Sequence, residues 1–90
     1  MAKAHADPAE LRRFAQDLTR FNNELGSLMS SLNSRLNALE SVWQDQEYRK
    51  FQESFAAVYK GLVVFMQESE VQAKGLSKKA SLLEEYLKGR

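Results

Sequence analysis

A break divides the chain into two long stretches, and it constrains the fold more than any other feature of the sequence. It lies at residues 41–45, which read Ser-Val-Trp-Gln-Asp. On both sides of it, apolar side chains recur every three or four residues, the spacing of an α-helix with one apolar face. The first row is Leu11, Phe14, Leu18, Phe21, Leu25, Leu28, Leu32, Leu36 and Leu39; the second is Tyr48, Phe51, Phe55, Val58, Leu62, Phe65 or Met66, Ala73, Leu76, Ala80, Leu83 and Leu87. The pattern predicts an all-α antiparallel helix-turn-helix hairpin.

The helix boundaries follow from capping residues. Asp7 can accept hydrogen bonds from free backbone amides and Pro8 suits the first helical position, so the first helix is placed at residues 8–41. The Trp turn follows at 42–45, and Asp45 is expected to cap a second helix at 46–87. The whole chain, residues 1–90, is interpreted as a single helical-hairpin domain.

Folding the chain about the turn gives an expected register between the helices. It places Phe14 opposite Ala73, and Gly26 opposite Gly61. Glycine is unfavourable inside a helix unless packing requires it. We therefore expect Gly26 and Gly61 to mark a close approach of the two helix axes.

Composition limits the classes of function. The chain has 90 residues, 13 basic against 12 acidic, and no cysteine. Disulfides and thiolate metal sites are therefore excluded, and the near balance of interspersed charges argues against nucleic acid as a partner. His5 is the only histidine, and no metal-ligand spacing surrounds it. We expect no cofactor, no metal and no catalysis, with carboxylate pairs such as Glu84 and Glu85 lying on solvated helix faces.

The start of the chain and its hydropathy bear on localisation. The first residues lack the apolar core of a secretory signal peptide. The longest wholly apolar run, residues 62–66, is too short to cross a bilayer. The sequence predicts a protein made in the cytoplasm without a signal peptide and without stable membrane insertion.

Two features indicate that one hairpin is incomplete. The segment Leu62, Val63, Val64, Phe65 and Met66 is apolar around the whole helix, which is typical of a helix buried on all sides. The second helix is also longer than the first, so Leu82, Leu83, Tyr86 and Leu87 project past the start of the first helix. A second hairpin packed antiparallel, forming a four-helix bundle, would cover both features. The partner is either a second copy or a related small helical protein.

The same residues resemble the WXG family, the small ESAT-like helical-hairpin proteins of bacterial type VII secretion. The resemblance rests on a first helix opened by Asp-Pro-Ala-Glu-Leu-Arg, the central Trp43 turn, Phe51 eight residues after it, and Tyr86 near the end of the second helix. It implies a bacterial protein that forms homodimeric or heterodimeric four-helix bundles, leaves the cell folded, and contacts a secretion ATPase.

Two positions depart from the family pattern. The turn motif falls on Trp43, Gln44 and Asp45, so Asp45 replaces the family's glycine. Aspartate tolerates turns and caps helices, so the turn is expected to survive. The family's export signal is a Tyr followed four residues later by an acid, whereas Tyr86 is followed at that spacing by Arg90. Three alternatives follow: export depends on a signal carried by a partner, the chain belongs to a divergent system, or it is not exported at all.

Two functions remain open at this point. The first is a dimeric secreted substrate or export partner of a type VII pathway, with Trp43, Asp45 and Tyr86 as lead residues. The second is a structural adaptor or secretion-apparatus hairpin that is not itself exported. Trp43 is either part of a recognition surface or a plug that closes the hairpin, and Tyr86 either docks on an ATPase or makes a contact within the dimer.

Overall fold

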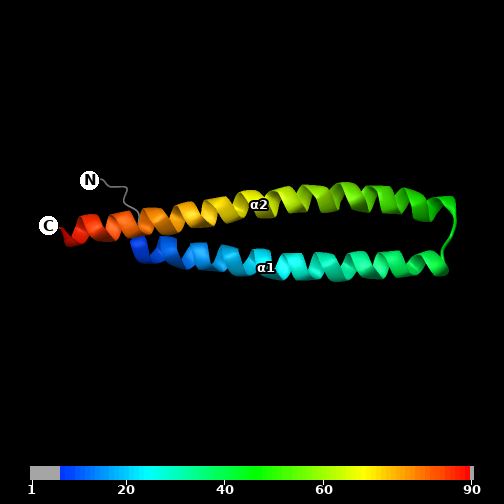
Figure 1. Cartoon of the computed structure of the whole chain (residues 1–90), viewed down its shortest axis with the longest axis horizontal. Coiled ribbons are helices and arrows are strands. Elements are labelled where there is room, and N and C mark those ends of the chain that lie inside the picture. The colour runs from blue at the N-terminus through cyan, green and yellow to red at the C-terminus, as the bar shows by residue number, and fades with distance from the viewer. Residues whose placement is uncertain (1–6, 90) are drawn as a thin grey trace.

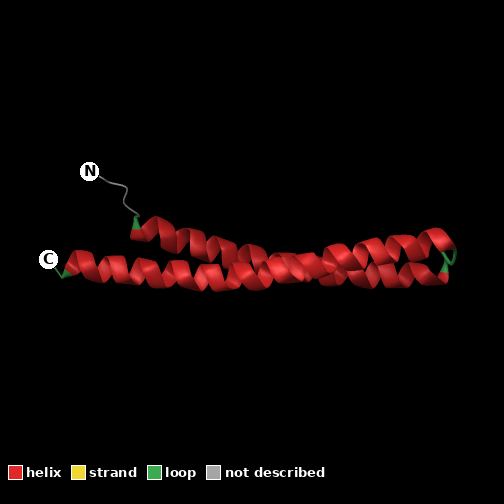
Figure 2. Cartoon of the chain, turned by 90° about the horizontal axis from the view of Figure 1, so that it is seen from above, coloured by secondary structure: helices red, strands yellow, loops and turns green. Residues whose placement is uncertain are grey.

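The computed structural model describes residues 7–89, so His5 and Arg90 lie outside the described part. Helix α1 spans Pro8–Ala38, a 3-10 turn spans Leu39–Ser41, and helix α2 spans Gln46–Lys88. The helices lie antiparallel along each other (Figure 1) and cross at a shallow angle when viewed from above (Figure 2). The hairpin is a rod 68 Å long and 15–20 Å across. The predicted all-α hairpin is confirmed.

The start of each helix is capped as expected. The Asp7 carboxylate accepts a hydrogen bond from the Ala9 amide at 2.9 Å, with Pro8 in the first turn. The Asp45 carboxylate accepts one from the Tyr48 amide at 3.1 Å. These bonds satisfy amides that lack an intrahelical partner and place negative charge at the positive end of the helix dipole.

The first helix ends earlier than residue 41. Its last turn tightens to 3-10 geometry over Leu39–Ser41, and the amides of Val42 and Trp43 both donate to the Leu39 carbonyl, at 2.9 and 2.8 Å. Such tight turns are common at the ends of α-helices because they satisfy carbonyls that lack an intrahelical donor. The second helix runs one residue past the expected end, to Lys88.

The seam between the helices is lined by side chains of mixed size, from alanine to tyrosine. Along α2, eleven of the buried and half-buried positions alternate steps of four and three residues, which is the spacing of a coiled-coil seam. They are Tyr48, Gln52, Phe55, Tyr59, Leu62, Met66, Ser69, Ala73, Leu76, Ala80 and Leu83. On α1 the buried residues are Ala15, Met29 and Leu36.

The structure does not show the close approach of the two helices that was expected at Gly26 and Gly61. Gly26 lies beside Met66, whose Sδ would be 3.9 Å from a Cβ added at Gly26, and a Cβ at Gly61 would meet nothing within 4 Å. An alanine would fit at both positions, so this hairpin does not require glycine at either. Phe14 is 57% exposed, and Ala15 beside it is the residue that enters the seam.

Asn22 is an exception in the seam, because both polar atoms of its side chain are buried without a hydrogen-bond partner within residues 7–89. A buried polar group that makes no hydrogen bond destabilises the folded state. We expect Asn22→Leu to raise the free energy of unfolding by about 1–2 kcal/mol, measured by urea denaturation. A lower stability would indicate that Asn22 bonds a group or a water molecule in solution.

The end of the hairpin opposite the turn is closed by a polar contact. The Arg12 guanidinium lies 2.7 Å from the Glu84 carboxylate and 3.2 Å from the Ser81 hydroxyl. This contact joins the start of α1 to the last turns of α2. Beyond it, the end of α2 projects past the start of α1 (Figure 1).

Candidate functional site

One side of the hairpin exposes large apolar side chains from both helices. On α1 these are Phe14, Phe21, Leu28, Leu32 and Leu39, which are 41–68% exposed; on α2 they are Phe51, Val58 and Phe65, which are 45–59% exposed. Helical spacing puts each set along one line of its helix. The rings of Phe21 and Phe65 meet edge to face at 6.5 Å, so the two lines adjoin across the seam. We call these eight residues the apolar face.

The apolar face is hollowed near the turn. Leu32, Arg35, Leu36, Leu39, Phe51 and Phe55 line a groove of about 280 Å³ between the helices. Arg35 is the single charged residue among them, and within residues 7–89 it makes no salt bridge. The groove can bind an apolar side chain, and the Arg35 guanidinium can pair with a carboxylate next to that side chain.

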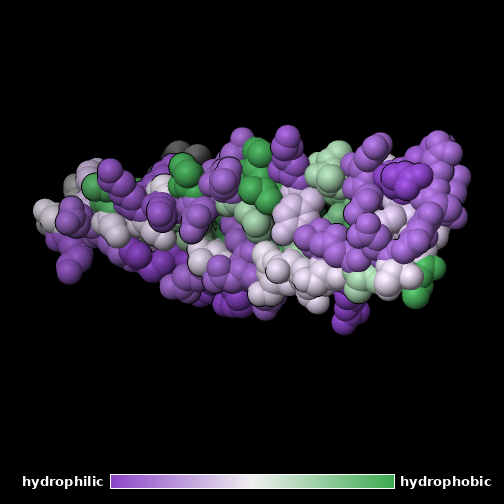
Figure 3. Space-filling model, turned by 45° about the vertical axis from the view of Figure 1, so that its right-hand side comes forward, coloured by the Kyte–Doolittle hydropathy of each residue, from purple (hydrophilic) through white to green (hydrophobic). Residues whose placement is uncertain are grey.

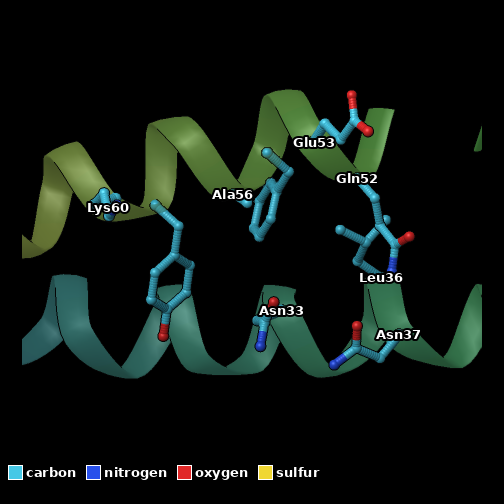
Figure 4. A pocket seen from close by; sticks show the side chains of 9 residues that line it. Asn33, Leu36, Asn37, Gln52, Glu53, Ala56 and Lys60 are labelled. Atoms are coloured by element: carbon cyan, nitrogen blue, oxygen red, sulfur yellow. The ribbon is translucent and has the colours of Figure 1, made fainter. Parts of the chain in front are cut away.

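The other side of the seam is more polar than the apolar face. A groove there is lined by Asn33, Asn37, Gln52, Glu53 and Lys60, together with apolar residues (Figure 4). In this view the two asparagines of α1 lie across from residues of α2. A space-filling view shows a largely hydrophilic surface with separate hydrophobic patches (Figure 3). Of the two sides of the seam, the apolar face is therefore the one that calls more for an apolar partner.

Trp43 lies at the turn within an aromatic cluster. Its ring is half-buried and meets the rings of Tyr48 at 5.2 Å and of Phe51 at 6.4 Å. Phe51 belongs to the apolar face, so the cluster joins the turn to that face. Gln44 and Asp45 are exposed beside it.

The turn does not need glycine at the position of Asp45. Asp45 has φ −116° and ψ −176°, an extended conformation, and no residue in 7–89 has a positive φ. Every amino acid except proline can adopt these angles, and aspartate adds the cap on α2. The departure from the family's turn motif is therefore compatible with the backbone found here.

Tyr48 is the residue at this end whose role the sequence did not indicate. It is 2% exposed, and its hydroxyl donates a 2.7 Å hydrogen bond to the Leu36 carbonyl of α1. It therefore fastens the second helix to the first, next to Trp43. The position of Tyr48 in the apolar row predicted that its side chain is buried. The hydrogen bond to Leu36 could not be predicted, because it depends on where the end of α1 lies.

Burial raises the pKa of Tyr48 above its ordinary value of 10.0, and the Glu40 carboxylate raises it further. Tyr48 therefore ionises in the unfolded chain before it does so in the folded one. Its contribution to stability is complete below pH 10 and is lost as the pH rises above that value. We expect the urea concentration at the unfolding midpoint to decrease as the pH rises from about 9 to about 11, the range around the ordinary tyrosine pKa. The decrease should be smaller in Tyr48→Phe. Equal slopes for both proteins would contradict this.

The predicted dimer-core segment is divided between two surfaces. Leu62 and Met66 are half-buried in the seam, whereas Phe65 and Val64 are 45% and 46% exposed. Val63 is half-buried. Phe65 thus belongs to the apolar face and Val64 to the outer surface of α2. The apolar row of the first helix includes Phe14, Phe21 and Leu28, and the structure exposes all three.

At the end of α2, Leu82, Tyr86 and Leu87 are 58–65% exposed, and Leu83 is half-buried. The end of α2 lies at the far end of the rod from the turn between the helices (Figure 1), so one hairpin does not bring the tail and the turn together. Within residues 7–89, no group of three or more acidic or histidine side chains could hold a metal ion. Neither described helix has a stretch apolar and long enough to span a membrane.

Comparison with known proteins gives a family and a fold. The sequence model of a family described as WXG100, proteins of 100 residues with WXG, matches residues 4–86. Structures of EsxB from Bacillus anthracis str. Sterne, described as a secreted protein, are similar to the hairpin. One, in the wild-type form, has a TM-score of 0.80 at 24% identity, covering 93% of this chain and 98% of that one. Another has a TM-score of 0.79 at 23% identity, covering 96% and 98%. No curated protein sequence matches the chain.

Proposed function

The chain belongs to the WXG100 family, and from this premise we propose that it is a non-catalytic protein of a bacterial type VII secretion pathway. It acts there as a dimeric secreted substrate or as the export partner of one. The observation that carries this proposal is the family match over residues 4–86, which includes the turn and Tyr86. The EsxB proteins with the same fold, described as secreted, support it.

The apolar face supports the dimeric part of the proposal. Its eight large side chains are about half exposed on one side of the hairpin, and an exposed apolar patch of this size is typical of a protein interface. A hairpin 15–20 Å across also has too little interior to bury them itself. A second hairpin laid on this face completes a four-helix bundle. The partner is a second copy or a related small helical protein.

Trp43 and Tyr86 are the proposed recognition residues. Because the turn that holds Trp43 and the end of α2 that holds Tyr86 lie at opposite ends of the rod (Figure 1), an antiparallel partner would bring its Tyr86 towards this chain's Trp43. We propose that this combined surface, with Leu82 and Leu87 beside Tyr86, is what a secretion ATPase contacts. The half-buried ring of Trp43 is consistent with both roles considered for it, closing the hairpin and presenting a surface.

One sequence feature favours the alternative of an adaptor or apparatus subunit that is not exported. Arg90 stands where the family's export signal has an acid. The tail therefore carries a positive charge where a receptor for that signal would meet a negative one. In that case the same apolar face would serve assembly inside the cell.

Export can be tested in a bacterium that has a type VII system, with and without its ATPase gene. We expect the tagged chain in the culture supernatant only when the ATPase is present, with a cytoplasmic enzyme as the lysis control. Arg90→Glu should increase export if the chain carries its own signal, with Arg90→Gln as the control for loss of charge alone. Retention of all forms inside cells would contradict export and support the adaptor. Light scattering of the purified chain tests dimerisation separately.

A further inference from the structure

A groove on the side of the hairpin away from the apolar face has no role in the proposed dimer. It lies between α1 and α2 and has a volume of about 450 Å³ (Figure 4). Leu36, Phe55 and Ala56 contribute apolar side chains to its lining, and the other lining residues have polar groups. Grooves of this size that combine apolar side chains with a few polar groups are typical of binding sites. Because this groove lies across the seam from the apolar face, a hairpin packed on that face leaves it open.

The groove offers three carboxamides that have no partner in the hairpin. They belong to Asn33 and Asn37 on α1 and to Gln52 on α2, and Asn33 and Gln52 are half-buried. Within residues 7–89 none of the three side chains makes a hydrogen bond to another residue. A carboxamide carries donor N–H groups beside an acceptor oxygen. The matching ligand also presents a donor next to an acceptor, as each residue of a polypeptide backbone does.

The spacing of the two asparagines matches an extended backbone. Asn33 and Asn37 are four residues apart, which is ~6 Å along α1. In an extended peptide the N–H and C=O of every second residue point to the same edge, and such residues are about 6.4–6.8 Å apart. The two carboxamides can therefore bond alternate residues of one extended segment that runs along the groove. A partner helix lacks this match, because its backbone groups bond one another within the helix.

The charged residues of the lining indicate which charges such a segment carries. Glu53 and Lys60 are exposed and lie seven residues apart on α2, which is ~10.5 Å along its axis. Neither makes a salt bridge within residues 7–89. Three steps of an extended chain span ~10 Å. A four-residue segment with a basic residue at one end and an acidic residue at the other therefore places each charge beside its opposite.

We propose that this groove binds an extended segment of another polypeptide through the backbone of that segment. The carboxamides of Asn33 and Asn37 bond alternate residues of the segment. Glu53 and Lys60 meet its two terminal charges, and one apolar side chain between these charges packs against Phe55. The site is separate from the apolar face. It therefore adds a second partner to the dimer of the proposed function, and either can fail without the other.

Nuclear magnetic resonance can test this binding, because each Asn and Gln side-chain amide gives its own signals. The probes are acetyl-Lys-Val-Thr-Glu-amide and acetyl-Glu-Thr-Val-Lys-amide, since the groove does not fix the direction of the segment. We expect one of them to shift the side-chain signals of Asn33, Asn37 and Gln52 with a dissociation constant of about 1 mM, as a few hydrogen bonds allow. Asn33→Ala and Asn37→Ala should each weaken binding about three- to tenfold. Asn23→Ala removes an exposed amide outside this groove and should leave binding unchanged.

The matched control on the side of the ligand is the same peptide methylated on its Val and Thr nitrogens, which keeps every side chain and loses two backbone donors. We expect it not to bind, and equal binding would overturn recognition of the backbone. No shift with either peptide at concentrations well above that dissociation constant would overturn the site. Shifts caused by chitotriose but by neither peptide would overturn the peptide and identify a carbohydrate as the ligand. Leu28→Asp acts on the apolar face and should leave peptide binding unchanged, so failure of the dimer and failure of this groove are distinguished.

Discussion

Leu28→Asp is expected to convert the purified chain from a dimer to a monomer without unfolding the hairpin. Leu28 is 68% exposed on the apolar face, so the stability of the single hairpin should change little when this residue becomes polar. In a symmetric dimer the substitution acts twice. Each loss of a buried leucine costs about 1.5–3 kcal/mol, so the dissociation constant should rise about a hundredfold or more. Sedimentation or light scattering over a concentration series measures it, with far-UV circular dichroism as the check on helicity.

Ser34→Asp is the matched control for this experiment. Ser34 is also exposed on α1 but lies off the apolar row. The same charge placed there should leave the dissociation constant within a few-fold of the wild type. If both variants remained dimeric, the interface would lie on another side of the hairpin, and the polar groove near Asn33 and Gln52 would become the next candidate.

Tyr48→Ala should cause the largest loss of hairpin stability among substitutions near the turn. The side chain is 2% exposed, packs against Trp43, and bonds the Leu36 carbonyl across the seam. Removing it leaves a cavity and one carbonyl without its second hydrogen bond. We expect the midpoint of thermal unfolding to fall by roughly 10–20 °C, followed by circular dichroism at 222 nm.

Two variants separate the contributions of Tyr48. Tyr48→Phe keeps the ring and removes the hydroxyl, so it should cause only a minor part of that fall. Tyr86→Ala makes the same truncation at a position that is 65% exposed, and it should change the midpoint much less. A small effect of Tyr48→Ala would mean that the end of α1 and the turn are held by other contacts, with Trp43 the first to test.

Local sequence signals predicted the elements well because the forces behind them act over a few residues. Asp7 and Asp45 were expected to cap the two helices, and both do so through their carboxylates. The early end of α1 was missed because the 3-10 turn at Leu39–Ser41 depends on how the chain enters the loop. The role of Tyr48 was missed for the same reason.

The candidate site was predicted only in part. The sequence indicated that residues 62–66 exceed what one partner helix can cover, and the exposure of Val64 and Phe65 agrees with this. It did not indicate that Phe14, Phe21 and Leu28 also belong to an exposed face. The sequence did carry a signal for this face, because the apolar row of the first helix repeats at both three and four residues and is wide enough to contact two neighbouring helices. Periodicity does not say which edge of the row faces the second helix of the same hairpin.

The sequence by itself determined that this protein is a helical hairpin with a turn at Trp43 and more apolar surface than two helices can bury. Helical period, capping and length are properties of each segment alone. Only the tertiary structure decided how each helix is rotated about its axis. Ala15, Ala73 and Ala80 are buried in the seam, and the larger Phe14 and Phe21 are left outside it. That rotation depends on all contacts of both helices at once, and it is what creates the apolar face.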